Sequence, residues 1–473
     1  MTAGAPQNPV TVNDRHSALN LTHVAEIVPV RSIEDICAAV KEATRTERGV
    51  AICGGRHAMG GQQFSSNDIL VDTAEFNSVV SLDAERGLVE VNSGIQWQEL
   101  HEWLLANQAG VEKVWTFRQK QTGANRLSIG GCLAANVHGR GLTLPPFVSD
   151  VESFTIIGSQ GEPKLCSREE NADLFALAIG GYGLFGVIGN VTLRLTERYK
   201  VRRVVEIGRI DDLQESFDRR IAEGFLYGDF QFEIDPVADT FLQRGVFSCY
   251  QPVGSDASIP EDQRILAPDD WRGLLMLAHT DKSAAFDRYA EHYLATSGQV
   301  YWSDSHQFAT YIDDYHLAVD EVLGHQGSEV ITEIFVPRSR LTEYMAAAAD
   351  YLRGNDIDLI YGTIRLVRRD DETFLAWARR DYACIIFNLH VRHDATGHEE
   401  AGTAFRGLID LAITHNGSFY LTYHRHATRE QIEVCHPKFS EFLTLKRAHD
   451  PQERFTSDWY RHHRDLFEMA QAW

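Results

Sequence analysis

The sequence predicts an α+β protein made of more than one domain, and three observations support this. A chain of 473 residues is long enough to form two or three domains with large buried cores. From about Val28 onward, helical and short β-rich segments alternate, and three glycine-rich segments interrupt them before Arg198. Beyond Arg198 these glycine-rich segments stop, while strands and helices continue to about residue 425. The change in pattern predicts a domain boundary shortly after residue 200.

The individual elements follow from periodicity and from residues that favour helix ends. Ser32 is expected to be the N-cap of an amphipathic helix over residues 32–47, with Asp35 in its first turn. Short runs of branched and apolar residues predict strands. These runs are residues 50–53, 68–72, 88–92, 151–158 and 187–195. Further helices are expected over residues 97–106 and 172–179, and in the tail over residues 429–466.

The net charge of −22 argues against two classes of partner. Such a charge repels the phosphates of nucleic acids and the head groups of anionic lipids. The sequence also contains no run of about 18 apolar residues, which a membrane-spanning helix would need. We therefore expect neither a nucleic-acid partner nor a membrane association.

The seven cysteines are scattered and form no CxxC pair, so a zinc knuckle or dithiol redox motif is not predicted. An odd number of cysteines in a long chain fits reduced thiols in a cytoplasm. Residues 1–20 are polar and lack the apolar stretch of a signal peptide. These features predict a cytoplasmic protein with a flexible leader over residues 1–20.

The first glycine-rich segment, CGGRHAMGGQQ over residues 53–63, directly follows an expected strand. Four glycines in eight positions allow the backbone to turn sharply and to approach a ligand closely. Successive backbone N–H groups in such a turn form a concave set of donors that suits a pair of phosphates. The alternative is a loop that only joins two strands.

The second segment, SIGGCLAANVHGRG, covers residues 128–141. Its small residues would allow a large flat ligand to lie against the backbone, although a tightly packed structural turn would have the same composition. The third segment, GGYGLFGVI over residues 180–188, contains a formal GxGxxG pattern. A dinucleotide fingerprint needs a strand before it and a helix after it, whereas here the order is reversed, so a Rossmann domain is not predicted.

The order and spacing of the three segments resemble the PCMH-type FAD-binding domain of the vanillyl-alcohol oxidase and p-cresol methylhydroxylase family. The nearest branches are alditol and aldonolactone oxidases, cytokinin dehydrogenase and decaprenylphosphoryl-ribose oxidase. The resemblance covers residues 22–200 and 430–465. It implies a two-subdomain FAD-binding domain over residues 21–204, an α+β substrate (cap) domain with an antiparallel sheet over residues 205–428, and a C-terminal segment over residues 429–473 that returns to the FAD domain.

In that family the first segment binds the FAD pyrophosphate and the other two line the rest of the cofactor. The residues that the resemblance assigns to FAD binding are Gly54, Gly55, Arg56, His57, Ala58, Gly60, Gln62, Ser128, Gly130, Gly131, Ala135, Asn136, His138, Gly141, Gly181, Gly183, Gly186, Val187 and Ile188.

The resemblance also implies that His57 is bonded covalently to the flavin 8α-methyl. His57 precedes Gln62 by five residues, as the tethering histidine does in several family members. The sequence departs from the family at Arg56, where many members have glycine. Some members carry a second tether, a cysteine just ahead of the second segment, but residues 124–126 here are Ala-Asn-Arg. One tether is therefore predicted. The alternatives are that His57 only packs against the flavin edge or points away from it.

The second domain is expected to place polar side chains over the flavin. Strands are expected over residues 361–366, 384–390 and 420–426. Arg365, Asn388, His390 and Tyr423 lie in these strands, where an unpartnered polar group is costly. A substrate site would give these four residues partners, and His390 and Tyr423 are the candidate bases. The alternatives are a structural ion pair for Arg365 and a core position for His390. No metal is predicted, because the alternate histidines at positions 424 and 426 are more often solvent-facing.

Arg365 matches an arginine that contacts substrate in alditol oxidases, but Thr363 replaces the glutamate two residues earlier. The resemblance therefore implies hydride transfer to FAD from an alcohol carbon of a sugar-like or other hydroxylated small molecule, with reoxidation by O₂ or another acceptor. A second hypothesis is a dehydrogenase or reductase acting on a C–C bond or on a lipid-linked substrate. A third hypothesis is a flavoprotein without enzymatic activity that serves as a scaffold or binding module.

Overall fold

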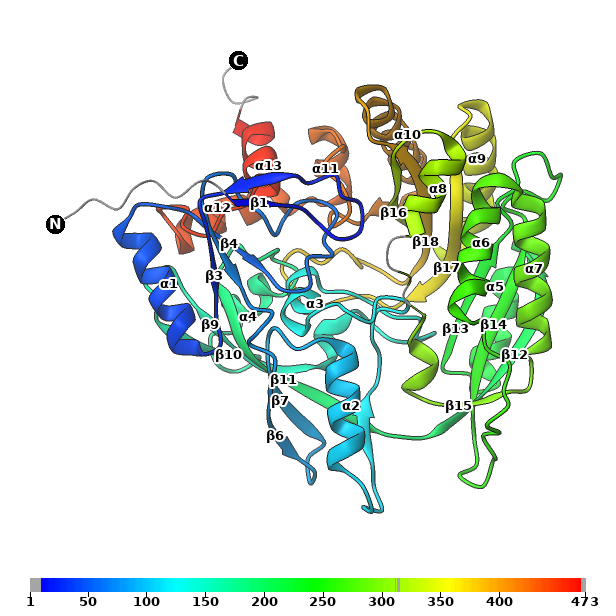
Figure 1. Cartoon of the computed structure of the whole chain (residues 1–473), viewed down its shortest axis with the longest axis horizontal. Helices are drawn as coiled ribbons and strands as arrows, with labels where there is room; N and C mark the ends of the chain where they lie inside the picture. Colours follow the sequence, from blue (N-terminus) through cyan, green and yellow to red (C-terminus); the bar gives the residue numbers. More distant parts are fainter. Residues whose placement is uncertain (1–9, 311, 313–314, 469–473) are drawn as a thin grey trace.

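The computed structural model describes residues 10–310, 312 and 315–468. Figure 1 shows two parts side by side. The N-terminal part, blue to cyan, lies beside the C-terminal helices in red, and a large sheet in green and yellow forms the other part. Helices and mostly antiparallel sheets make up both parts, which confirms the predicted α+β class.

A small parallel sheet begins the N-terminal part. Its order is β3-β5-β4, and α1 (Ile33–Arg45) packs on it. As predicted, the Ser32 hydroxyl caps this helix by accepting a hydrogen bond of 3.1 Å from the Asp35 backbone N–H. The strands are β3 (Glu26–Pro29), β4 (Val50–Cys53) and β5 (Ile69–Asp72).

An antiparallel sheet completes the N-terminal part. Its order is β10-β9-β11-β7-β6, and β8 pairs with β11. The strands are β6 (Val79–Asp83), β7 (Leu88–Asn92), β8 (Trp115–Phe117), β9 (Val151–Ile157), β10 (Pro163–Ser167) and β11 (Val187–Glu197). The associated helices are α2 (Trp97–Asn107), α3 (Ile129–Ala135), η1 (Phe147–Asp150) and α4 (Ala172–Ala178). The strand and helix predictions for this part are confirmed to within a few residues.

The second part is built on an eight-stranded antiparallel sheet of order β15-β12-β14-β13-β17-β18-β16-β19. Its strands are β12 (Lys200–Arg209), β13 (Tyr227–Phe232), β14 (Arg244–Val253), β15 (Val300–Trp302), β16 (Gly327–Pro337), β17 (Leu359–Val367), β18 (Tyr382–Arg392) and β19 (Ser418–Phe419). Short turns of 3₁₀ helix, η2 (Ser305–Gln307) and η3 (Arg338–Arg340), follow β15 and β16.

Helices cover both faces of this sheet, and the strand register separates them. Phe247, which lies on one face, packs edge-to-face against Phe217 of α5 (Ile210–Ala222). Val246, its neighbour on the other face, packs with Phe286 of α7 (Lys282–Ala295). The first face also carries α9 (Leu341–Gly354) and α10 (Ala395–Thr414), and the second carries α6 (Pro268–Thr280) and α8 (Tyr315–Leu323).

Both ends of the described chain join the N-terminal part. Residues 10–20 were expected to be a loose leader, but β1 (Val10–Val12) pairs with β2 (Thr22–Val24), and the buried Asn20 amide donates to the Met59 carbonyl oxygen at 2.7 Å. At the other end, Phe455 forms a parallel bridge with Val50 of β4. The final helices are α11 (Arg429–Cys435), α12 (Phe439–His449) and α13 (Asp458–Glu468). Residues 1–9 of the expected leader lie outside the described part of the chain.

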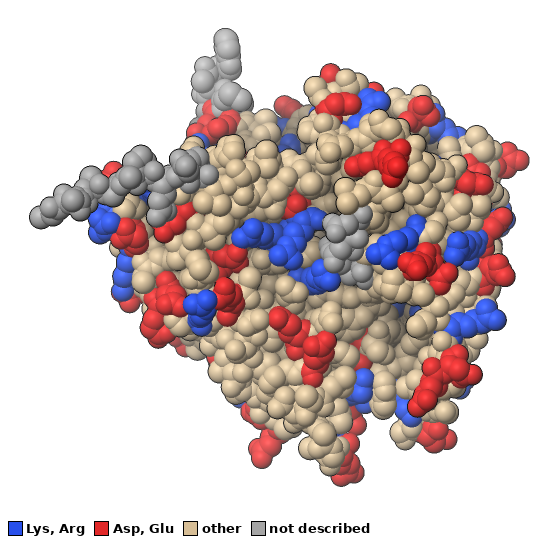
Figure 2. Space-filling model, in the orientation of Figure 1, with Lys and Arg blue, Asp and Glu red and all other residues tan. Residues whose placement is uncertain are grey.

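The run of aromatic and polar residues over positions 420–426 was expected to form a strand. It forms a series of turns after β19 instead. Within the described ranges, no helix has the length and apolar character that a membrane crossing requires. Figure 2 shows acidic side chains spread over one face of the molecule, with basic side chains grouped near the middle of that face.

Candidate active site

One cavity brings the three glycine-rich segments together between the two parts of the molecule. Its empty volume, including solvent at the mouth, is about 1510 Å³. Thr422, Tyr423 and Ile331 of the second part close its other side. The predicted cofactor residues that line it are Gly54, Gly55, Arg56, His57, Ala58, Gln62, Ser128, Gly130, Gly131, Ala135, Gly183, Gly186 and Ile188.

The loop after β4 presents backbone donors to this cavity. Within the described residues, the backbone N–H groups of Gly54, Gly55, Arg56 and Ala58 donate no hydrogen bond to the protein. Buried backbone N–H groups are rarely left without an acceptor. A row of such donors beside a cavity suits the oxygens of a pyrophosphate, so the loop fits the phosphate end of FAD.

Arg56 stands where the family resemblance leads one to expect glycine, and its backbone conformation fits that expectation. The backbone φ of Arg56 is 58°, in the left-handed region that residues other than glycine rarely adopt. The Arg56 guanidinium forms an ion pair of 2.6 Å with Asp72 at the end of β5. This ion pair stabilises a conformation that glycine adopts without strain.

We expect Arg56→Gly to retain FAD and to keep its stability nearly unchanged. The left-handed conformation costs a non-glycine residue roughly 1–2 kcal/mol, so relief of this strain offsets the lost ion pair. Arg56→Val loses the same ion pair but places a β-branched residue at positive φ, so it should lower both flavin content and the melting temperature. Flavin absorbance per chain and thermal unfolding of the two variants measure this. Equal losses in both variants would show that the ion pair, rather than the backbone conformation, dominates.

His57 lines the cavity two residues after the Gly54-Gly55 turn. Burial, together with nearby His16 and Arg15, lowers the pKa of His57 to about 4. The imidazole is therefore neutral near pH 7, which is the form in which a ring nitrogen can act as a nucleophile.

The second segment provides a wall of backbone. Its Ser128 is the N-cap of α3, and Gly130 lies so close to Ser93 that an added Cβ would be 2.8 Å from the Ser93 Cβ. Gly131 is less enclosed, because an added Cβ there would contact only the Ser128 hydroxyl, at 3.1 Å. The small residues of this segment therefore serve both tight packing and access to the cavity.

Six residues assigned to the cofactor from sequence do not line the cavity: Gly60, Asn136, His138, Gly141, Gly181 and Val187. Asn136 shows the reason. It ends α3 in the left-handed conformation, its amide donates to Asp370 at 2.9 Å, and its oxygen accepts from the Val148 backbone N–H. These contacts hold the segment against the second part of the molecule, so Asn136 has a packing role in place of the expected cofactor contact.

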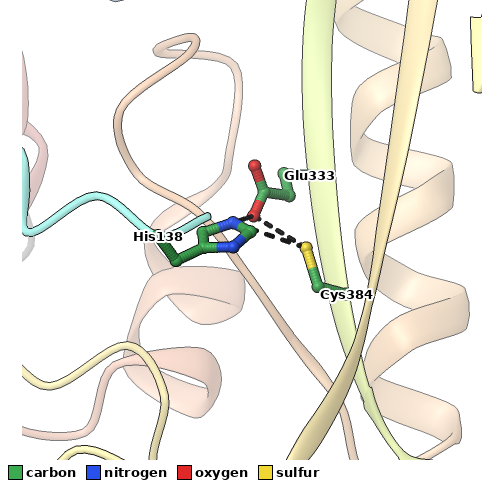
Figure 3. A group of neighbouring side chains, drawn as sticks. All are labelled: His138, Glu333 and Cys384. Carbon is green, nitrogen blue, oxygen red and sulfur yellow. Dashed lines mark hydrogen bonds and ion pairs between the residues drawn. The ribbon is translucent and has the colours of Figure 1, made fainter. Parts of the chain in front are cut away.

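His138 reaches away from the cofactor segment to the large sheet, as Figure 3 shows. Its Nε2 shares a hydrogen bond of 2.5 Å with Oε1 of Glu333 on β16, and the Cys384 thiol on β18 donates to the same oxygen at 2.9 Å. Burial works against ionisation of Glu333, but its contacts with His138 and Cys384 outweigh it, so the pKa of this carboxyl lies below its usual value. A buried carboxylate therefore stands at the junction of the two parts. Nothing in the sequence pattern singled out Glu333.

The strand register places the predicted substrate residues on one face of the sheet. Ile331, which lines the cavity, lies opposite Asn388, and Glu329 two residues earlier lies opposite His390. On β17, Arg365 lies opposite Cys384 and therefore shares this face. The face is the one that the cavity meets, although Arg365, Asn388 and His390 do not themselves line the cavity.

Tyr423 is the one predicted substrate residue that does line the cavity. Its hydroxyl accepts a hydrogen bond of 3.1 Å from the side-chain amide of Gln121, another lining residue that the sequence did not reveal. Burial, reinforced by the negative charge of Glu333, raises the pKa of Tyr423 well above its usual value. The phenol therefore keeps its proton, which favours a role as hydrogen-bond donor over a role as base.

Arg365 carries a buried positive charge close to Tyr423 and Glu333. Across the described part of the chain, its guanidinium forms no hydrogen bond and no ion pair. The expected alternative, a structural ion pair, is therefore not present among these residues. An unpaired buried guanidinium suits a ligand that brings a negative or strongly polar oxygen.

Comparison with known proteins agrees with this geometry. Residues 24–167 match a family described as FAD binding domain. The chain is 29% identical to an uncharacterised oxidoreductase of the fasciation locus of Rhodococcoides fascians, over 37% of this chain and 38% of that protein. It is 28% identical to mitochondrial L-galactono-1,4-lactone dehydrogenase 2 of rice (Oryza sativa subsp. japonica), over 33% of this chain and 25% of that protein. It is also 29% identical to cytokinin dehydrogenase 5 of the same rice subspecies, over 35% of this chain and 32% of that protein.

The matched region therefore spans only a quarter to two fifths of these relatives' own length. It nevertheless contains the first two glycine-rich segments, the row of backbone donors and His57. Residues 24–167 therefore match an FAD-binding domain, in agreement with the PCMH-type family that the glycine-rich segments resemble.

Proposed function

We propose that the protein is an FAD-dependent oxidoreductase that oxidises an alcohol carbon of a sugar-like or other hydroxylated small molecule. The observation that carries the proposal is that the same cavity is lined by the FAD-binding segments and by Gln121 and Tyr423. FAD, when bound, supplies the hydride acceptor. The similarity to a protein named as a lactone dehydrogenase supports a sugar-like substrate.

The protein's own residues would orient the substrate and balance charge. The Tyr423 hydroxyl, held by Gln121 and fully protonated at neutral pH, donates a hydrogen bond to a substrate oxygen. The buried charge of Arg365 lies close to Tyr423 without lining the cavity, and it would favour negative charge on that oxygen through its electrostatic field.

The competing hypothesis is action on a C–C bond or a lipid-linked substrate. The Tyr423 hydroxyl proton and the Arg365 guanidinium favour a hydroxylated substrate, because an apolar chain would give neither group an acceptor. One relative is named as a cytokinin dehydrogenase, so the test includes substrates of both kinds.

The test is anaerobic mixing of the purified protein with panels of polyols, aldonolactones and unsaturated compounds. We expect at least one hydroxylated compound to bleach the visible absorbance of the flavin. Readmission of oxygen should then restore the absorbance with release of hydrogen peroxide if oxygen is the acceptor, whereas a dehydrogenase would need an added dye. Bleaching by unsaturated compounds alone would favour the C–C hypothesis, and a flavin that no compound in either panel bleaches would contradict the proposal.

A further inference from the structure

A second group of polar side chains lies on the same face of the sheet, away from the FAD segments. His279 of α6, Glu329 of β16 and His390 of β18 bring their ligand atoms within 4.8 Å of one another. These side chains are 0%, 1% and 5% exposed, so the group is closed to bulk water. Two imidazoles and a carboxylate are a common donor set for divalent transition metals.

The separations match those around a metal ion. His279 Nε2 lies 3.1 Å from Glu329 Oε1, and His390 Nδ1 lies 3.5 Å from the same oxygen. Ligands at 2.0–2.1 Å from a tetrahedral zinc ion lie about 3.3 Å apart, between these two values. The two histidine–carboxylate pairs lie within ion-pair distance, yet the three atoms form no hydrogen bond with any described residue. Buried polar atoms that converge without a hydrogen bond suit a bound ion.

Neighbouring side chains hold the three ligand side chains in position, as residues that contact the ligands do in known metal sites. The other ring nitrogen of His390 is 3.0 Å from Nε2 of His325, which restrains the ring and leaves Nδ1 facing Glu329. The second carboxylate oxygen of Glu329 accepts from the Tyr315 hydroxyl, so only Oε1 faces the two histidines. His316 Nε2 lies 3.4 Å from that second oxygen.

The described residues contain another group of potential metal ligands, His138, Glu333 and Cys384, which differs in its hydrogen bonding. There the ligand atoms hydrogen-bond to one another at 2.5 and 2.9 Å, so each is already satisfied without an ion. The contrast between the two groups singles out the one at Glu329.

We propose that His279 Nε2, Glu329 Oε1 and His390 Nδ1 bind one divalent transition metal ion of the zinc class. Three protein ligands leave a fourth position open for water or for an oxygen of a bound molecule. Glu329 lies two residues before the cavity-lining Ile331 on the same face of β16, so the proposed site lies next to the wall of the cavity. This site replaces the expectation that the protein carries no metal, and it does not depend on the proposed alcohol oxidation.

The experiment measures metal content and zinc affinity of the full-length flavoprotein, purified without a histidine tag and stripped with a chelator. We expect about one tightly bound zinc per chain on titration. Glu329→Gln, which keeps the size of the side chain but removes its charge, and His279→Ala should each weaken binding at least tenfold with flavin content unchanged. His398→Ala, which removes an exposed histidine of α10, should bind zinc as the wild type does.

Zinc-edge X-ray absorption of the wild type provides a readout that needs no variant, and it should show two imidazole nitrogens and an oxygen around the metal. The proposal is overturned if the stripped wild type binds no zinc on titration. It is also overturned if folded Glu329→Gln binds zinc as tightly as the wild type, or if the absorption spectrum shows no imidazole ligands. Magnesium, which prefers oxygen ligands and octahedral geometry, should not compete.

Discussion

Replacing His57 with alanine is expected to release all of the flavin from acid-precipitated protein, whereas wild-type precipitate should stay yellow. The physical reason is the neutral imidazole of His57 in the wall of the cavity, since its pKa of about 4 leaves it unprotonated at neutral pH. A bond between a ring nitrogen of His57 and the 8α carbon would replace one C–H bond of that methyl group and the imidazole N–H bond. The two protons would leave to solvent, and the two electrons would pass to the flavin ring and then to oxygen. The intact mass of the wild-type chain should therefore exceed the mass of the polypeptide by one FAD less two hydrogen atoms, and that of His57→Ala should not.

The matched control is His16→Ala. His16 also lines the cavity, and burial also lowers the pKa of His16, so it tests whether any neutral imidazole in this cavity suffices. We expect this variant to keep its tethered flavin. If acid treatment releases the wild-type flavin, the prediction of a covalent bond to His57 is wrong. The FAD site itself would stand, because it depends on the backbone donors and glycine-rich segments.

Tyr423→Phe is expected to slow flavin reduction by substrate about 10²-fold, without loss of FAD. This is the effect of removing one donor positioned toward an oxygen on which charge develops. The variant keeps the ring and removes only the hydroxyl that Gln121 holds and that stays protonated because of burial. Rapid mixing under anaerobic conditions measures the reduction rate at saturating substrate, and a titration of the rate with substrate separates binding from the chemical step.

Tyr351→Phe is the control, since that hydroxyl only donates to the Thr403 carbonyl oxygen between α9 and α10. It should leave the reduction rate unchanged. If Tyr423→Phe raises only the substrate concentration needed for half-maximal rate, Tyr423 contributes to ground-state binding alone. An unchanged rate at every concentration would remove Tyr423 from the mechanism.

The FAD-binding segments could be found from the sequence because their constraints are local. A strand followed at once by a glycine-rich loop determines both the turn and the exposure of its backbone N–H groups, and His57 lies inside that loop. The strands β17 and β18 were also predictable, because their apolar residues and the spacing of Arg365, Asn388 and His390 follow a period of two.

The polar groups on the sheet could not be predicted because their members are far apart in the chain. His138 and Glu333 are separated by 195 residues, and no local pattern relates them. The turns at residues 420–426 were missed for a related reason. Aromatic and branched residues there favour a strand, but Tyr420 instead donates its hydroxyl to the Ala135 carbonyl oxygen and packs on Trp377.

The bridge between Phe455 and Val50 has a consequence for the order in which the molecule is made. The Val50 N–H donates to the Arg454 carbonyl oxygen at 2.6 Å, the Asp458 N–H donates to that of Phe64 at 2.8 Å, and Thr456 lines the cavity. During translation the loop that receives FAD is thus synthesised about 400 residues before the segment that covers it. Until that segment leaves the ribosome, β4 has an unpaired edge, which is a site of aggregation in nascent chains. We therefore expect cofactor capture to be a late, post-translational event.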